Sequence, residues 1–183
     1  MPITTVDPKT ALIVVDMQKG VVGMPTVHSV DTVIQRIGVL LQVFRARGLP
    51  VALVNVAGTP PGRTDTGVVD ASRLPADWTE LIEQVDPQPG DIRVTKRARS
   101  GFTGTGLADR LHSLEVTQVV VVGLATSVGV ETTALDAYER GFHVTLPVDA
   151  MTDRTLERHN HSVTTVFPGI AQTGTTADVL AVL

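Results

Sequence analysis

Hydrophobic positions recur along the chain with two different periods. Short, continuously apolar runs rich in valine and isoleucine are typical of strands buried on both faces of a sheet. They predict strands at residues 10–16, 50–56, 91–96, 118–124 and 142–150, and a short sixth strand at 171–174. The intervening segments place apolar residues at helical spacing, and in the segment 33–48 one helical face is predicted to carry Val33, Ile37, Leu40, Leu41 and Phe44. They predict helices at 33–48, 78–85, 106–115, 128–141, 156–167 and 176–183.

This alternation of strands and helices is typical of a parallel sheet covered by helices on both faces. We therefore predict a three-layer α/β/α fold of the Rossmann-like type, with a central, mostly parallel sheet of six strands. No linker or internal repeat divides the sequence, so residues 1–183 are expected to form a single domain. The irregular stretch 57–77 exceeds a normal connection, and we expect a lid, an oligomer contact or a mobile loop there.

The amino-acid composition excludes several classes of function. Hydrophobic residues make up 43% of the chain and charged residues 19%, which is typical of a compact globule. The net charge is −4 and no basic block is present, so neither nucleic acid nor a membrane surface is an expected partner. The chain has no cysteine, which excludes disulfides and thiol nucleophiles. The N-terminal segment does not resemble a secretory signal, and a cytoplasmic location is expected.

Two ionisable residues end predicted strands, and the carboxyl ends of parallel strands border the ligand crevice. Asp16 ends the strand at 10–16 and Lys96 ends the strand at 91–96. Partial burial raises a carboxyl pKa and lowers a lysine pKa, whereas proximity of the two groups opposes both shifts. Such a pair can divide acid, base and charge-stabilising roles. In the alternative, structural interpretation, Asp16 caps the segment that follows it and Lys96 serves only as the ion-pair partner of its carboxylate. The scarcity of lysine, with Lys9 and Lys19 as the other two, favours a specific role.

Other candidate sites are weaker. Glycines 101, 104 and 106 lie between a strand and a helix, close to Arg97 and Arg99, and could cradle a phosphate. Their spacing matches neither the dinucleotide fingerprint nor the P-loop, so a loop that needs permissive backbone is the favoured interpretation. His159 and His161 point in different directions on a helix and make a poor metal pair. Ser127 is interpreted as a helix N-cap. We expect no metal and no cofactor.

Three segments together resemble the isochorismatase-like hydrolase superfamily. They are ALIVVDMQKG (11–20), VTKRARSGFTGTGL (94–107) and VVVVGLATSVGVETTALDAYERGFHVTLPVDAMTD (119–153). Most members of this superfamily are cysteine hydrolases with an Asp, Lys and Cys triad that act on amides. Their third motif has the form G-x-A-T-x-x-C-V, whereas GLATSVGV has Gly129 at the cysteine position. The metal-binding Asp/His cluster of nicotinamidases is also missing from NVAGTPPGRT after the second strand.

The resemblance implies a chemistry that needs no nucleophilic side chain. True isochorismatases also have glycine at this position, and they hydrolyse a vinyl ether with release of pyruvate. By this resemblance Asp16 is the acid that protonates the enol-ether carbon, and Lys96 stabilises the developing charge and orients the substrate. The backbone N–H groups of Ala125 and Gly129 are the expected oxyanion donors, and a non-proline cis peptide is expected at Leu124–Ala125.

The resemblance also implies a substrate pocket lined by Gln18, Phe102 and Leu124. It is incomplete, because isochorismatases have Tyr-Ala-His where this chain has residues 125–127, and Trp-Arg-Tyr-Ser-Ala-Phe where it has residues 97–102. Isochorismate itself is therefore not the favoured substrate. The leading hypothesis is a hydrolase of a small molecule that acts without a nucleophilic cysteine. The alternative is a non-catalytic, ligand-binding member of the fold. Assembly as a homo-oligomer, a dimer or larger, is expected.

Overall fold

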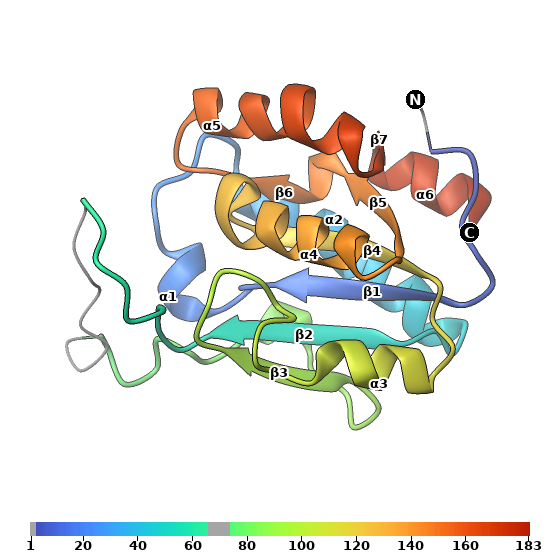
Figure 1. The fold of residues 1–183 in the computed structure, drawn as a ribbon, viewed down its shortest axis with the longest axis horizontal. Helices are drawn as coiled ribbons and strands as arrows, with labels where there is room; N and C mark the ends of the chain where they lie inside the picture. The colour runs from blue at the N-terminus through green and yellow to red at the C-terminus, as the bar shows by residue number, and fades with distance from the viewer. Residues whose placement is uncertain (1–2, 66–73) are drawn as a thin grey trace.

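A parallel sheet forms the middle layer of the computed structural model, which describes residues 3–65 and 74–183 (Figure 1). Its strand order in the described residues is β3-β2-β1-β4-β5-β7, and β6 pairs with β4 as a seventh strand. The strands are β1 (Thr10–Val15), β2 (Val51–Val56), β3 (Ile92–Lys96), β4 (Gln118–Leu124), β5 (His143–Pro147), β6 (Met151–Thr152) and β7 (Gln172–Gly174). The predicted α/β class is confirmed, and the sheet has one strand more than expected.

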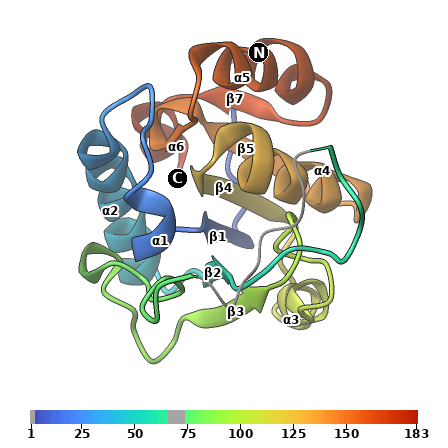
Figure 2. The same ribbon diagram turned by 90° about the vertical axis from the view of Figure 1, so that its left-hand side faces the viewer.

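Helices cover both faces of the sheet. Figure 2 shows α2 (Val30–Ala46) and α6 (Thr176–Val182) on one side, and α3 (Leu107–Ser113) and α4 (Glu131–Glu139) on the other. Each side has its own core, because successive strand residues point to opposite faces. The buried face of α2 is the predicted one and consists of Val33, Ile37, Leu40, Leu41 and Phe44. Of the helices in the described residues, none is long and apolar enough to cross a membrane.

The predicted strand at 142–150 is divided in the structure. β5 ends at Pro147, and a 3₁₀ turn over Val148–Ala150 leads to the two-residue strand β6. Proline supplies no N–H to a sheet ladder, which is consistent with the end of β5 at this position. After this turn the chain no longer continues β5, and β6 pairs with the last residues of β4 instead. It thereby brings the segment after β6 to the end of the sheet where β1 and β4 finish.

The predicted helix at 78–85 is wrong. Only a 3₁₀ turn, Glu83–Val85, forms there. The backbone of 78–82 instead pairs with the chain that follows β1, through hydrogen bonds from Lys19 N–H to the Glu80 carbonyl (2.8 Å) and from Ile82 N–H to the Met17 carbonyl (3.1 Å). These tertiary bonds replace the local bonds that a helix would make. The chain after β1 also forms a short helix, α1 (Lys19–Val22), that the sequence pattern did not predict.

Two other predicted helices begin or end in wider turns. A π-helical turn over Thr126–Val130 precedes α4, and α5 (Leu156–His161) continues into a π-helical turn at Ser162–Val166. A 3₁₀ turn at Phe167–Gly169 completes the second segment. Of the long irregular stretch at 57–77, residues 66–73 lie outside the described part of the chain.

Candidate active site

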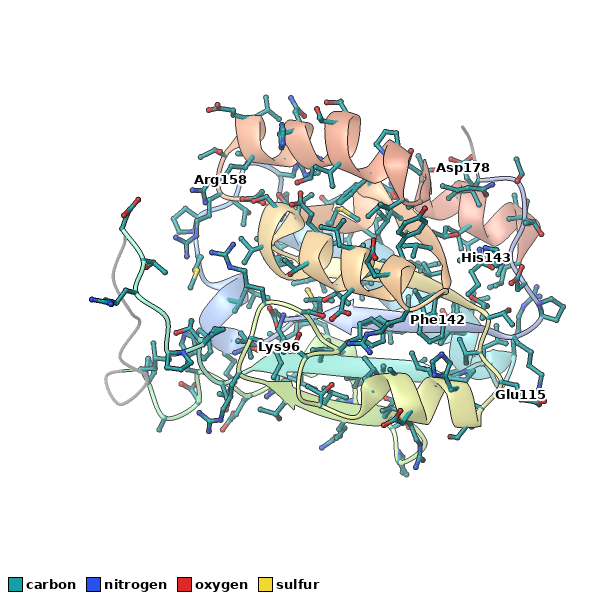
Figure 3. The ribbon with its side chains drawn as sticks, viewed as in Figure 1. Lys96, Glu115, Phe142, His143, Arg158 and Asp178 are labelled. Carbon is teal, nitrogen blue, oxygen red and sulfur yellow. The ribbon has the colours of Figure 1, made fainter. Side chains whose placement is uncertain are left out.

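Asp16 and Lys96 lie at the same edge of the sheet because β1 and β3 are parallel and flank β2. The ladder extends one residue beyond β1, since the Asp16 N–H donates to the Val54 carbonyl at 2.7 Å. Asp16 then turns the chain with a left-handed backbone (φ 54°). Figure 3 shows Lys96 far from Phe142 and His143, which mark the opposite end of the sheet. The strand-end positions predicted from the sequence therefore meet in space.

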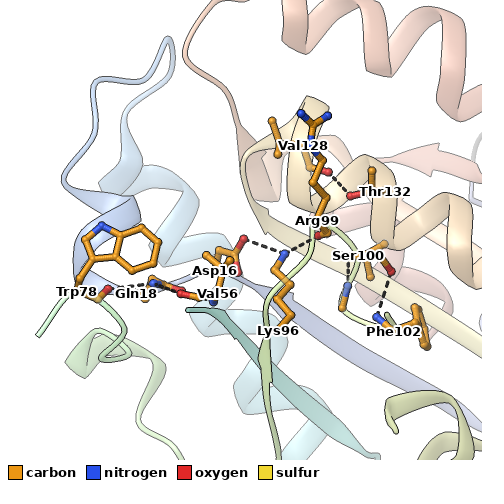
Figure 4. A network of polar contacts seen from close by, with 12 residues as sticks. Asp16, Gln18, Val56, Trp78, Lys96, Arg99, Ser100, Phe102, Val128 and Thr132 are labelled. Carbon is orange, nitrogen blue, oxygen red and sulfur yellow. Dashed lines mark hydrogen bonds and ion pairs between the residues drawn. The ribbon is translucent and has the colours of Figure 1, made fainter. Parts of the chain in front are cut away.

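The two side chains form a buried ion pair (Figure 4). The Lys96 Nζ lies 2.9 Å from Asp16 Oδ2, and the side chains are 0% and 8% exposed, respectively. Nζ also donates a hydrogen bond to the Arg99 carbonyl at 2.6 Å. Asp16 Oδ1 is buried and accepts no hydrogen bond from the described residues. A buried carboxylate oxygen without a partner is uncommon, and it marks this pair as a site that a ligand or proton can complete.

Burial controls the ionisation of both groups. Removal from water raises the pKa of Asp16 to about 6, although the charge and hydrogen bond of Lys96 act in the opposite direction. Burial likewise lowers the pKa of Lys96, against the effect of the Asp16 charge. A carboxyl group with this pKa exchanges its proton close to neutral pH, as a general acid or base must.

The chain passes close to the pair again after β4. The Leu124–Ala125 peptide bond is cis, as the family resemblance implied, and the turn at Thr126–Val130 follows. A Cβ atom placed on Gly129 would lie 2.9 Å from both Asp16 Oδ2 and Val15 Cγ1. It would also lie 3.0 Å from the Leu124 carbonyl oxygen. Glycine at 129 thus allows this turn to approach the Asp16 carboxylate.

Two residues that sequence analysis did not assign to the site hold this turn in place. Asp153 is buried, and its Oδ2 accepts a hydrogen bond from the Ser127 N–H at 2.7 Å. His159 Nδ1 lies 2.9 Å from the Thr126 hydroxyl. Ser127 is therefore held by its backbone and does not act as the predicted N-cap, since the turn has no side-chain cap. The aspartate that closes the third sequence motif was the available signal for Asp153.

Comparison with known proteins places the chain in a family. The family model for the isochorismatase domain matches residues 10–178. The chain belongs to the isochorismatase family. An uncharacterized isochorismatase family protein, YecD, of Escherichia coli O157:H7 is 34% identical over 95% of this chain and 96% of its own length. The maleamate amidohydrolase of Pseudomonas putida is 30% identical over 82% of this chain and 76% of its own.

Solved structures of the isochorismatase family have the same fold. The structure of an isochorismatase family protein from Burkholderia thailandensis superposes with a TM-score of 0.92 at 34% identity. The match covers 98% of this chain and 97% of that one. Together, these relatives support a hydrolase of the isochorismatase family.

In this isochorismatase-family chain, Gln18 is buried two residues after Asp16 and holds the surrounding backbone. Its side-chain amide donates to the carbonyls of Val56 (3.0 Å) and Trp78 (2.9 Å), and its Oε1 accepts from the Val56 N–H at 2.7 Å. The Trp78 indole covers Gly20, where a Cβ would lie only 2.0 Å from Trp78 Cδ1. Gln18 therefore ties β2 and Trp78 to the chain after β1. Its contact with substrate remains a prediction.

The other predicted pocket residues are deeply packed. Phe102 is buried and its ring stacks against Phe142 at 6.0 Å between centroids, and Leu124 is buried on the opposite core. Their contact with substrate is also still a prediction. In the 101–106 loop, Gly104 and Gly106 have φ values of 68° and 70°, consistent with the predicted need for permissive backbone. Residues 3–65 and 74–183 contain no group of three or more His, Asp or Glu side chains placed to hold a metal ion.

Proposed function

We propose that this protein hydrolyses a small molecule without a nucleophilic cysteine, with Asp16 as general acid and base and Lys96 as the charge-stabilising group. The observation that supports this most directly is the buried pair itself. One oxygen of Asp16 is bound to Lys96 and the other has no partner among the described residues. Because Gly129 places no side chain beside this carboxylate, we infer that the pair itself carries the chemistry of the site.

Vinyl-ether hydrolysis is the reaction that fits a site of this kind. The Asp16 carboxyl, with its raised pKa of about 6, donates a proton to the terminal enol carbon. The carbon attached to the ether oxygen becomes an oxocarbenium ion, to which water adds with loss of a proton to the Asp16 carboxylate. The resulting hemiketal loses its alcohol and becomes a ketone. Substrate and water thus give a ketone and an alcohol, and the acid is restored.

Lys96 and the turn after β4 have supporting roles in this proposal. The Lys96 ammonium is fixed by Asp16 and by the Arg99 carbonyl, so it needs no reorganisation to stabilise charge that changes during proton transfer. The backbone N–H groups of Ala125 and Gly129 would donate to the substrate oxygen. Asp153 and His159 hold the turn that carries them.

A substrate screen with matched variants tests the proposal. Purified protein is offered a panel of enolpyruvyl ethers, and released pyruvate is measured with lactate dehydrogenase. Asp16→Asn and Lys96→Met are expected to lose the activity while retaining the folded near-UV circular dichroism spectrum. If both variants turn over substrate as the wild type does, the proposal is wrong. If the wild type binds members of the panel but converts none, the ligand-binding alternative replaces it.

A further inference from the structure

Two histidines from distant parts of the chain meet beside the turn that follows β4. His28 lies in the loop before α2 and is exposed, whereas His159 lies on α5 and is buried, with 7% of its surface exposed. In Figure 1 and Figure 2 the chain between α1 and α2 runs beside the start of α5. The two rings are in edge-to-face contact, with 4.7 Å between their centroids and an interplanar angle of 68°. A positive charge on one ring therefore opposes a positive charge on the other.

Each imidazole contacts the hydroxyl of a buried threonine. His159 Nδ1 lies 2.9 Å from Thr126 Oγ1, at the first residue of the turn. His28 Nδ1 lies 3.1 Å from Thr152 Oγ1, which also accepts the His28 backbone N–H at 3.2 Å. Thr152 belongs to β6 and is in register with Leu124, the last residue of β4. The histidines therefore hold the turn directly through Thr126 and hold the strand beside its starting point through Thr152.

The Thr126 hydroxyl constrains the protonation of His159. Thr126 is 0% exposed, and among the described residues the hydrogen-bond partner of its hydroxyl is His159 Nδ1. A neutral His159 with its proton on Nε2 accepts the hydroxyl proton, whereas an imidazolium has N–H donors on both ring nitrogens and accepts none. Protonation of His159 would therefore leave a buried hydroxyl proton without an acceptor, which is unfavourable.

The charges that face His159 also favour its neutral form. Burial and the charge of His28 lower the pKa of His159, and the nearby Asp153 carboxylate opposes them. Asp153 is followed by Arg154, whose guanidinium lies beside the loop that carries His28, 2.9 Å from Met24 Sδ. The turn at 126–130 has no charged side chain. The other charged groups on the packed helices are exposed or bound: Asp31 on α2 and Glu157, Arg158 and His161 on α5 are exposed, and Glu131 on α4 accepts a hydrogen bond from the Ser162 hydroxyl.

We propose that His28 and His159 are positioning residues that hold the turn at Thr126–Val130 in place only while His159 is neutral. The inference rests on the proposed function for the use of this turn, whose backbone would supply the N–H groups of Ala125 and Gly129 to the substrate. It does not rest on the proposed function for the coupling between the histidines and the turn, which depends on the contacts with Thr126 and Thr152.

The hydrogen bond to Thr126 depends on pH in one direction. Because the pKa of His159 is lowered from 6.5 in the folded protein, the stabilising effect of the neutral ring is complete above pH 6.5. It is lost as the pH falls from 6.5 toward the lowered pKa. The Asp16 carboxyl, with its raised pKa of about 6, loses its proton as the pH rises. The proposed hydrolase should therefore lose activity on the acidic side through His159 and on the alkaline side through Asp16.

NMR on the free protein tests the coupling without a substrate. The imidazole Hε1 resonance gives the titration of His159, and hydrogen exchange of two backbone amides reports on the turn. Ser127 N–H donates to Asp153 at 2.7 Å, and Val130 N–H donates to the Ala125 carbonyl at 3.2 Å. After correction for intrinsic exchange, we expect their protection to fall roughly 10-fold or more from above pH 6.5 to below the His159 midpoint.

Variants identify the source of this pH dependence. His28→Asn removes the neighbouring charge, so the His159 midpoint and the loss of protection should both move to higher pH. Thr126→Val removes the hydroxyl that joins the ring to the turn, so the two amides should no longer follow the titration of His159, whereas Thr126→Ser should retain the response. His161→Gln is the matched control, because His161 is exposed on the same helix, and it should change neither quantity. In Asp16→Asn the response should persist, although Asp16 can no longer titrate.

The outcomes separate this inference from the proposed function. Protection that stays constant through the His159 titration overturns the inference, as does a response that persists in Thr126→Val or disappears in Asp16→Asn. An unchanged His159 midpoint in His28→Asn overturns the role of His28. In each of these cases, pyruvate release by the wild type and its loss in Asp16→Asn would still support the hydrolase. A coupled response in a protein that converts no substrate supports the positioning role and contradicts the proposed function.

Discussion

Two ion pairs in the described part of the chain, one partly buried and one buried, have different numbers of hydrogen-bond partners. Arg45 and Asp91 join α2 to the start of β3, with Arg45 Nη2 2.6 Å and Nε 3.3 Å from the two Asp91 oxygens. The Gln88 N–H also donates to Asp91 Oδ2 at 2.8 Å, and Arg45 reaches the Val85 carbonyl at 3.1 Å. In the Asp16–Lys96 pair, one carboxylate oxygen has no such partner among residues 3–65 and 74–183.

Under the proposed function, this difference separates a structural pair from a catalytic one. A fully hydrogen-bonded pair compensates for the loss of hydration and fixes neighbouring segments. A pair with an unmet acceptor is less stable than it could be, and it persists where a ligand or proton completes it. The comparison predicts that equal substitutions at the two pairs will have opposite consequences for activity and stability.

The largest expected effect is on catalysis. Asp16→Asn removes the proton donor while preserving the shape of the side chain, and we expect kcat/KM to fall by roughly 100- to 10,000-fold. Asp91→Asn makes the same chemical change at the structural pair, and we expect kcat/KM to be unchanged below the unfolding temperature. Steady-state kinetics on the substrate from the pyruvate screen measures both. A similar loss of kcat/KM in Asp16→Asn and Asp91→Asn would contradict the distinction between a catalytic and a structural pair.

Stability should show the reverse pattern. Replacement of a buried ion pair by apolar residues is often neutral or stabilising, by about 1–4 kcal/mol. We therefore expect Asp16→Leu/Lys96→Met to stay within about 1 kcal/mol of the wild type in free energy of unfolding, because the strain of leucine at the left-handed Asp16 backbone (φ 54°) and the lost partner of the Arg99 carbonyl offset the gain. Asp91→Leu/Arg45→Met should instead lose about 1–3 kcal/mol, because the Gln88 N–H and Val85 carbonyl lose their partners. Urea denaturation monitored by circular dichroism decides between this order and its reverse.

The pKa of Asp16 tests the Asp16–Lys96 pair alone, without the contribution of the rest of the fold. Its pKa is raised to about 6 by burial and held down by Lys96, so Lys96→Met should raise it further. The folded-state pKa lies above the unfolded value of 3.8, so the stabilising effect of the bound proton is complete below pH 3.8. It is lost as the pH rises through about 6. If the protonated acid is the active form, kcat/KM falls over the same upper range.

Carboxyl ¹³C NMR titration of wild type and Lys96→Met measures this pKa directly. A wild-type midpoint at the unfolded value would remove the basis for Asp16 as a general acid near neutral pH. A midpoint that falls in Lys96→Met would contradict the assigned effect of the lysine. The unfolding free energy of wild type between pH 4 and 7 gives an independent check of the sign.

Sequence periodicity predicted the layers, the buried face of α2 and the strand ends where Asp16 and Lys96 meet. These features depend on local pattern and on the geometry common to parallel sheets. The 78–85 segment could not be predicted this way, because its backbone bonds are made to Met17 and Lys19, about sixty residues earlier. The contribution of Asp153 was missed for a similar reason, since it depends on the displacement of β6 onto β4.

The smallest predicted effect concerns the space beside the pair. A Cβ on Gly129 would meet Asp16 Oδ2, Val15 Cγ1 and the Leu124 carbonyl at 2.9–3.0 Å, so Gly129→Ala must displace the carboxylate or the turn. We expect a roughly 10-fold loss of kcat/KM and a stability loss of about 1–3 kcal/mol. Gly38 is the matched control, because a Cβ there meets nothing within 4 Å on α2. Gly38→Ala should raise stability by up to about 1 kcal/mol and leave kinetics unchanged.

Gly129→Cys sharpens the same test. The cysteine introduces the same Cβ, with the same contacts to Val15 and Asp16, and adds a thiol that must find room beyond it. We therefore expect no amidase activity from this single substitution, measured as ammonia released from a panel of small amides. Ammonia release would show that the turn relaxes easily around residue 129. In that case the fold would not require the turn to lie so close to Asp16. Gly129 would matter only because it supplies no nucleophile.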